Sequence, residues 1–363
     1  MNYFWSKYDL EERIKLLEKI KREKSPIEQE EIDSFIYLIN KDINYLKGIH
    51  KEPLPYLIKV KKDIIKKGTI SEIVSDIENF SELDIDIGNH EIPNNFLFFT
   101  DEDILDITND FYKNQNKSIY RKFLEFYNER RNHLVFVEGF HPESNITFFI
   151  PYFNEIFMSI NKTNTLSTLY SSIHEFAHAI SFKYNSEVTL YDKNKQLFLE
   201  IETLFFELVA SDYFTTNINT KDEYHEIIQN HYLFLHESKI FDDRMKIANL
   251  VMQSDIKTNE EFRKICNEEL HFTNDYLDNI MKQNTLEILK YLTSYLFAIE
   301  LYELYKKDKE KALHILEKIM LMKNNSTLKY YNNIKELGLN PNSHTTNFLM
   351  DLDNKSRCRT IQQ

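Results

Sequence analysis

Glycine is almost absent from this chain, and its absence limits the folds that the chain can adopt. Only 5 glycines and 7 prolines occur among 363 residues, and both numbers are far below average usage. The glycines lie too far apart to form the GxGxxG or GxxxxGK(S/T) loops that cradle phosphates: Gly48, Gly68, Gly88, Gly139 and Gly338. The sequence therefore predicts a mainly α fold and argues against a dinucleotide-binding fold or a P-loop NTPase.

The charge and polarity of the chain limit the kinds of partner that it can bind. The 45 basic and 58 acidic residues give a formal net charge of −13, which opposes attraction to nucleic acid or to an anionic lipid surface. No apolar run approaches the roughly 18–20 residues needed to span a bilayer, and the first residues lack an apolar signal segment. We therefore expect a cytoplasmic protein without nucleic-acid or membrane partners.

Hydrophobic periodicity divides the chain into two regions. Residues 1–90 are predicted to form a helical N-terminal lobe, because their apolar positions repeat at helix spacing. Residues 91–363 are predicted to form one larger domain, which is helical from Asn164 onward. Capping-box patterns mark three helix starts in this domain: Thr100 with Asp103, Thr220 with Glu223, and Thr258 with Glu261.

A short β-rich region lies at the beginning of the larger domain. Three apolar runs, rich in Phe, Val and Ile, are predicted to be strands: 95–99, 134–137 and 146–150. Gly139 and Pro142 provide turn residues between the last two runs. We therefore predict a small sheet within about residues 95–153, whose last strand immediately precedes the next helix.

The most informative residues form an HExxH motif, His174-Glu175-Phe176-Ala177-His178, inside an apolar run with helix periodicity. On a helix, positions i and i+4 project from one face a turn apart, so both imidazoles can reach one zinc ion. Glu175 lies beside them and is a candidate general base for a zinc-activated water. The alternative is a pair of structural histidines on a core helix. The apolar context favours the zinc site, with one Zn²⁺ per chain.

A catalytic zinc site usually has three protein ligands, so the motif requires a third. The next strongly helical segment begins about twenty residues after His178 and contains three candidates, Glu200, Glu202 and Glu207. Glu200 and Glu207 are seven positions apart and share a helix face, whereas Glu202 points elsewhere. Spacing alone leaves the choice among them open.

These motifs resemble the thimet oligopeptidase and oligoendopeptidase F family of zinc metallopeptidases. The family's active-site helix has HEFGH or HELGH after a Thr-Leu approach, and Thr165-Leu166 stands in that register here. Its next helix has E-x-x-S and a further glutamate, which Glu200, Thr203 and Glu207 resemble. The resemblance implies that Glu200 is the third zinc ligand and that Glu207 supports a ligating histidine. Over residues 145–352 it implies a helical zincin-type metallopeptidase with a small β-sheet next to the active-site helix.

A further segment, residues 290–295, resembles the family's C-terminal Q-Y-A-T-G-F element. The resemblance implies that Tyr291, or less directly Tyr295, stabilises the developing oxyanion, because a phenol donor can hydrogen-bond that charge. The family also has a histidine and a tyrosine some ten residues earlier, which residues 279–284 lack. His271 and Tyr276 are the nearest substitutes.

The sequence as a whole favours a zinc-dependent endopeptidase that hydrolyses short or unfolded peptides. Glu175 and Tyr291 are its predicted catalytic residues, and an extended peptide substrate is expected at the edge of the small sheet. Two alternatives stay open: a dedicated leader- or precursor-processing protease of a bacterial peptide pathway, and a non-catalytic peptide-binding homologue. The sequence does not indicate an oligomeric state.

Overall fold

A computed structural model of the chain places its helices and its small sheet. It describes residues 99–130, 133–138, 145–150, 155–163, 165–185, 195–217, 223–282, 285–324, 326–341, 343–345 and 347–348, and a few single positions before residue 99. The predicted strand at 95–99 falls outside the described residues except for Phe99, and so does most of the predicted lobe of residues 1–90.

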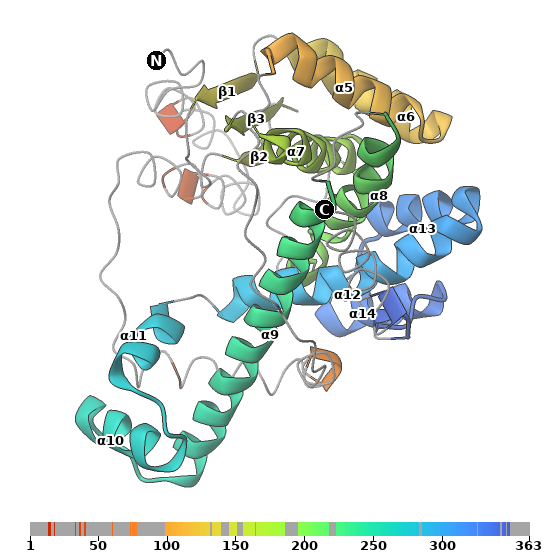
Figure 1. The fold of residues 1–363 in the computed structure, drawn as a ribbon. Helices are drawn as coiled ribbons and strands as arrows, with labels where there is room; N and C mark the ends of the chain where they lie inside the picture. The colour runs from red at the N-terminus through yellow and green to blue at the C-terminus, as the bar shows by residue number, and fades with distance from the viewer. Residues whose placement is uncertain are drawn as a thin grey trace, which may run out of the picture.

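The described part of the chain is mainly helical, as the scarcity of glycine predicts (Figure 1). In chain order its elements are α5 (Asp101–Lys113), α6 (Lys117–Glu129), β1 (Leu134–Glu138), β2 (Ile146–Ile150), β3 (Glu155–Lys162), α7 (Leu166–Tyr184), a 3₁₀ turn (Gln196–Phe198), α8 (Ile201–Asn217), α9 (Glu223–Gln253), α10 (Asn259–Glu269), α11 (Asn274–Lys282), α12 (Thr285–Lys307), α13 (Lys309–Leu321) and α14 (Thr327–Glu336).

Two of the predicted capping boxes are confirmed. At the start of α5, Thr100 accepts a hydrogen bond from the backbone N–H of Asp103, whose side chain accepts one from Thr100 in return. Thr258 and Glu261 make the same reciprocal pair at the start of α10. These bonds satisfy N–H groups that have no partner within the helix. Thr220, the third predicted cap, lies outside the described residues.

The sheet has three strands in the order β1-β3-β2, with β3 parallel to β1 and antiparallel to β2. The two predicted strands at 134–137 and 146–150 are confirmed, but the prediction that the latter immediately precedes the active-site helix is wrong. The missed central strand, β3, lies between them and extends the sheet to residue 162. Six consecutive residues of β3 are buried, so it lacks the apolar–polar alternation by which a half-buried strand is recognised.

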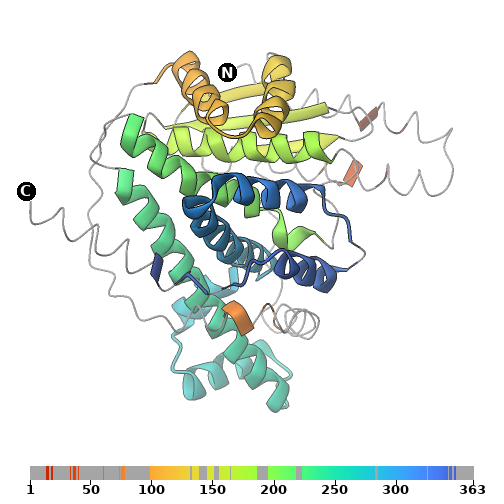
Figure 2. The ribbon, with the colours of Figure 1, turned by 90° about the vertical axis from the view of Figure 1, so that its right-hand side faces the viewer.

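Helix α7 occupies the middle of the body and is buried along most of its length. Strands β2 and β3 and helices α5 and α6 pack on it from one side, and α8 and α13 contact it from other directions (Figures 1 and 2). Aromatic rings fill the contact with α6, where Phe176 lies 5.1 Å from Phe123 between ring centroids. The buried Tyr112 hydroxyl of α5 donates a hydrogen bond to the carbonyl of Ile173, 2.6 Å away.

The four helices that follow α8, from α9 to α12, lie at different distances from the body of the protein. Helix α9 runs away from the body and has α10 and α11 at its far end, whereas α12 returns to pack against α8 (Figure 1). Near that far end, the Tyr276 hydroxyl donates to Asp243 of α9 over 2.6 Å.

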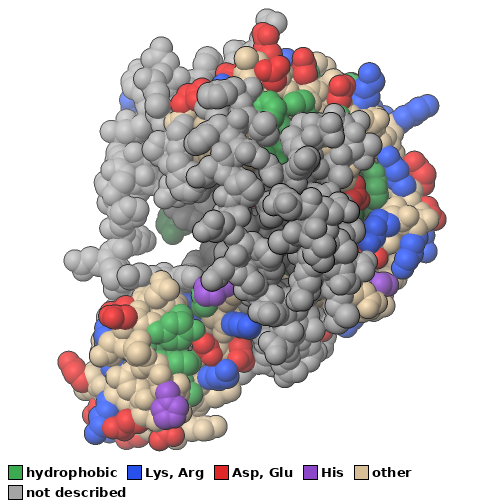
Figure 3. All heavy atoms as spheres, viewed as in Figure 1, with side chains coloured by type: hydrophobic (Ala, Val, Ile, Leu, Met, Phe, Trp, Pro, Cys, Tyr) green, Lys and Arg blue, Asp and Glu red, His purple; other side chains and the backbone are tan. Residues whose placement is uncertain are grey.

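Acidic and basic side chains are interspersed on the described part of the face in Figure 3. None of the described helices is both long enough and apolar enough to cross a bilayer.

A few described positions before residue 99 contact the larger region. Val60, Ile73 and Ile77 are buried and belong to the same hydrophobic core as α7. The Tyr331 hydroxyl of α14 donates to the Asp76 carboxylate. These three apolar residues of the predicted N-terminal lobe therefore share the core of the larger region.

Candidate metal centre

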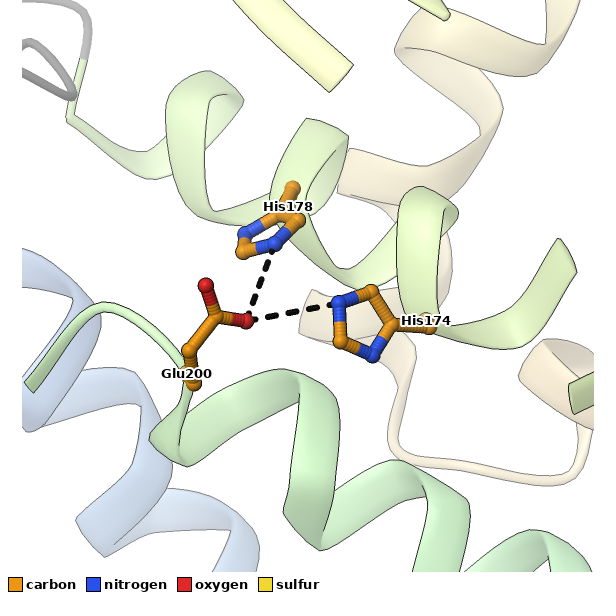
Figure 4. Close-up of side chains that lie close together, drawn as sticks. All are labelled: His174, His178 and Glu200. Atoms are coloured by element: carbon orange, nitrogen blue, oxygen red, sulfur yellow. Dashed lines mark ion pairs between the residues drawn. The ribbon is translucent and has the colours of Figure 1, made fainter. Parts of the chain in front are cut away.

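Two histidines of α7 and one glutamate from a neighbouring segment converge on a point between the helices. The His174 and His178 rings project from one face of α7, with centroids 5.0 Å apart. The Nε2 atom of each ring lies 3.3 Å from the same oxygen, Oε2 of Glu200 (Figure 4). Glu200 is the last residue before α8, and its carbonyl accepts the backbone N–H of Leu204. The turn that starts α8 thus aims this carboxylate at α7.

The spacing of these atoms fits a metal ion. Ligand atoms about 2.0–2.1 Å from a tetrahedral zinc ion stand about 3.3–3.4 Å apart, and the two nitrogen-to-oxygen distances here are each 3.3 Å. Among the described residues, these side chains form the one group of three or more His, Cys, Asp or Glu whose ligand atoms all lie within 4.8 Å. Two imidazoles and a carboxylate are a typical donor set for zinc.

Glu207 controls the ring orientation of His174. Its Oε1 lies 2.6 Å from Nδ1 of His174, one turn and a half into α8. A hydrogen bond from Nδ1–H to this carboxylate leaves Nε2 available on the side of Glu200. Burial lowers the pKa of His174, but the hydrogen bonds to Glu200 and Glu207 outweigh it and raise the pKa well above its ordinary value. Such an acceptor makes the imidazole a stronger donor to a cation.

Both oxygens of the Glu200 carboxylate have partners within the protein. Oε2, the oxygen nearest the histidines, accepts a hydrogen bond from Thr203 over 3.0 Å. Oε1 lies 2.9 Å from the Nζ of Lys290 on α12. Burial raises the pKa of Glu200, but the Lys290 charge and the two histidines lower it well below the usual range. Glu200 is therefore ionised without a metal ion.

Glu202, the remaining candidate ligand, does not join this group. It is 1% exposed, and its Oε2 has no hydrogen-bond partner among the described residues. Because Glu202 follows Glu200 by two positions, α8 directs its side chain away from the histidines. Of the three glutamates among which spacing left the choice open, Glu200 is the one whose carboxylate lies beside both histidines.

Glu175 is held on the sheet side of α7. It is 3% exposed, and the Thr147 hydroxyl of β2 donates to its Oε2 over 2.7 Å. The same hydroxyl is 3.1 Å from the Glu175 carbonyl. Burial raises the pKa of Glu175, and the nearby histidines and the Thr147 hydrogen bond only partly offset it. A buried carboxylate with a raised pKa beside a candidate metal group is placed to take up and release a proton.

Comparison with solved structures places this architecture among peptidases. One structure described as oligoendopeptidase F matches with a TM-score of 0.52 and 11% identity, over 90% of this chain and 65% of the other. The chain has the oligoendopeptidase F fold. PZ peptidase A with an inhibitor (TM-score 0.49, 12% identity) and an oligoendopeptidase F from Bacillus anthracis str. Ames (0.47, 12%) also match over 90% of this chain.

This chain spans 63–66% of the length of those three structures. No protein-family model matches the sequence, and no curated protein matches it. The resemblance inferred from the motifs is therefore confirmed at the level of the fold.

The predicted tyrosines occupy different places in this oligoendopeptidase F fold. Tyr291 is partly buried on α12, and its ring centroid lies 4.5 Å from Lys290 Nζ, which brings it near Glu200. Tyr295 is buried in the core. Tyr276 is bonded to Asp243 near the far end of α9, and His271 is an exposed residue between α10 and α11 with a φ of 56°.

Sequence reasoning missed two residues that contact the candidate site. Lys290 lies within the segment that resembles the family's C-terminal element, but a lysine there gives no sign of its partner. Thr147 is the inward-facing threonine of a correctly predicted strand. Only the packing of α12 and β2 against the site residues brings these two side chains to the carboxylates.

Proposed function

We propose that this protein is a zinc-dependent endopeptidase that hydrolyses bonds in short or unfolded peptides. The strongest support is the spacing of the ligand atoms of His174, His178 and Glu200. Both Nε2 atoms lie 3.3 Å from Glu200 Oε2, which is the distance between neighbouring ligand atoms around a tetrahedral zinc ion. Glu175, adjacent in sequence to His174, adds a buried carboxylate to this group. The peptidase fold of the neighbouring structure agrees with this assignment.

In this proposal the three ligands hold one zinc ion per chain. Zinc would supply Lewis acidity, which polarises the scissile carbonyl and makes an attacking water more acidic. Glu207 fixes the tautomer of His174, and Thr203 donates a hydrogen bond to the Glu200 carboxylate. The ligand set is thereby oriented before a metal ion arrives, which reduces the reorganisation that binding requires.

Glu175 is the proposed general base. It takes a proton from the attacking water and delivers it to the nitrogen of the leaving amine, so one carboxyl group serves both steps. Its burial raises its pKa, which suits a group that must gain and lose a proton in one cycle. Thr147 directs Oε2 from the sheet side. Tyr291 is the proposed phenol donor to the oxyanion, since it lies on α12 beside Lys290.

The sheet suggests how a peptide is presented. Among the described residues β2 pairs with β3 alone, and Thr147 of β2 contacts Glu175. An extended peptide that pairs with the other edge of β2 would run past the general base. Backbone hydrogen bonds of this kind tolerate many sequences, which suits short or unfolded substrates.

The test combines metal analysis with one substitution. Purified protein should contain about one zinc ion, and Glu175→Gln should retain it while losing hydrolysis of short fluorogenic peptides. Glu202→Gln is the matched control, because Glu202 is equally buried (1% against 3% exposed) but lies outside the metal group; it should keep both properties. Wild-type hydrolysis rates in Glu175→Gln would overturn the mechanism. Cleavage restricted to one precursor peptide would instead support a dedicated processing protease.

A further inference from the structure

Lys290 contacts the oxygen of the candidate ligand Glu200 that is not shared by the histidines. Its Nζ lies 2.9 Å from Oε1, and the side chains of the two residues are only 15% and 5% exposed. The same ammonium group lies 4.5 Å from the Tyr291 ring centroid. An ion pair so little exposed to water is screened far less than a surface pair. Salt and water therefore weaken the effect of the Lys290 charge on Glu200 much less than they would at the surface.

The geometry divides the two oxygens of Glu200 between two partners. Oε1 is engaged by Lys290, whereas Oε2 is the atom 3.3 Å from both imidazole nitrogens. A free carboxylate can bind a cation through one or both oxygens. With Oε1 tied to an ammonium group, the carboxylate presents a single oxygen to a metal ion.

Lys290 also changes the charge that a metal ion meets. Two neutral imidazoles and one carboxylate carry a total charge of −1, and a lysine bonded to that carboxylate brings the sum to zero. Such a set resembles three neutral ligands. Because the carboxylate then donates less charge, the metal ion is bound less tightly but remains a stronger Lewis acid.

We propose that Lys290 is a positioning residue that limits Glu200 to one-oxygen coordination and cancels its charge. As a result, the site binds its metal ion less tightly, and the bound ion is a stronger Lewis acid. The inference rests on the proposed function only in assuming that the site binds zinc. An ordinary structural ion pair, which merely fastens α12 to the segment before α8, makes the opposite prediction: its loss would loosen Glu200 and weaken metal binding.

The experiment measures metal binding directly, in the full chain. Zinc affinity is obtained by competition with a chromophoric chelator, and the visible absorption of the Co²⁺-loaded protein reports the coordination number, since four-coordinate Co²⁺ absorbs more strongly than five-coordinate Co²⁺. The variants are Lys290→Met, which removes charge and donor, and Lys290→Arg, which keeps both. The matched control is Lys183→Met, because Lys183 is equally buried (11% exposed) and forms a 2.8 Å ion pair, but with Glu129.

We expect Lys290→Met to bind zinc at least about tenfold more tightly than the wild type and to lose about half of its Co²⁺ absorption. Lys290→Arg and Lys183→Met should match the wild type in both. If Lys290→Met does not fold, Lys290→Gln replaces it, with the same tightening of zinc binding expected. Zinc affinity in the uncharged variant that is unchanged or weaker would overturn the proposal. A wild type without zinc would overturn the proposed function as well, whereas unchanged affinity in Lys290→Met would refute the role of Lys290 alone.

Discussion

Thr147→Val tests how the sheet controls the proposed general base. The Thr147 hydroxyl donates to Glu175 Oε2 over 2.7 Å in a site where both side chains are buried. Valine keeps the branched shape of threonine and removes only the donor. Water cannot easily replace that donor, because Thr147 is 4% exposed and Glu175 is 3% exposed. The Thr147→Val substitution therefore destabilises the ionised form of Glu175 more than its protonated form, because the hydroxyl donor stabilises a charged carboxylate more strongly.

The size of the expected fall in kcat/KM follows from the kind of hydrogen bond that Thr147→Val removes. A hydrogen bond to a charged group contributes about 1.5–3 kcal/mol, and each 1.4 kcal/mol corresponds to about a tenfold change in an equilibrium constant. The Thr147 bond lowers the pKa of Glu175 against the effect of burial, so its removal raises that pKa further. On the acidic side of the profile, kcat/KM should fall by about ten- to a hundredfold. The loss should shrink as the pH rises and Glu175 ionises again.

The assay is the pH dependence of kcat/KM on one short fluorogenic peptide, with zinc content measured in parallel. Thr147→Ser is the control, because serine retains the hydroxyl and should keep the acidic limb close to that of the wild type. An acidic limb of Thr147→Val that superimposes on the wild-type limb would refute the reasoning. A loss of equal size at every pH would also refute it, since that result points to a distorted site rather than to a change in proton affinity.

Two further predictions concern metal support and pH-dependent stability. Glu207→Ala should weaken zinc binding by about 10–100-fold, because it removes the carboxylate 2.6 Å from His174 Nδ1. Competition with a chelator measures the zinc affinity, and an unchanged affinity would contradict the role of Glu207. Burial raises the pKa of Glu237 to about 7 from 4.5, so the native protein binds this proton more tightly than the unfolded chain does. Stability from this group is present below about pH 4.5 and is lost as the pH rises to about 7. Glu237→Gln should therefore be more stable than the wild type by about 1–2 kcal/mol at pH 8 and equal to it near pH 4.5, and urea unfolding at both pH values checks the difference.

Much of the fold can be predicted from the sequence because helices signal themselves locally. The confirmed caps at Thr100 and Thr258 depend on residues three positions apart, and the apolar period of residues 166–184 extends along a single helix. Strand β3 was missed for the opposite reason. Six consecutive residues of β3 are buried, and burial on both faces removes the alternation that would have revealed the strand.

The candidate site also has one part that local sequence predicts and another that depends on tertiary packing. The sequence by itself determined that His174 and His178 share a helix face with Glu175 between them, because a helical spacing of four residues is a local property of the backbone. Only the tertiary structure decided that Glu200 rather than Glu202 meets them, and that Lys290 and Thr147 bond to the two site carboxylates. Lys290 is 90 positions from Glu200 in the chain, and Thr147 is 28 positions from Glu175. Contacts between residues so far apart depend on how α12 and β2 pack against α7 and the start of α8, and no local pattern encodes that packing.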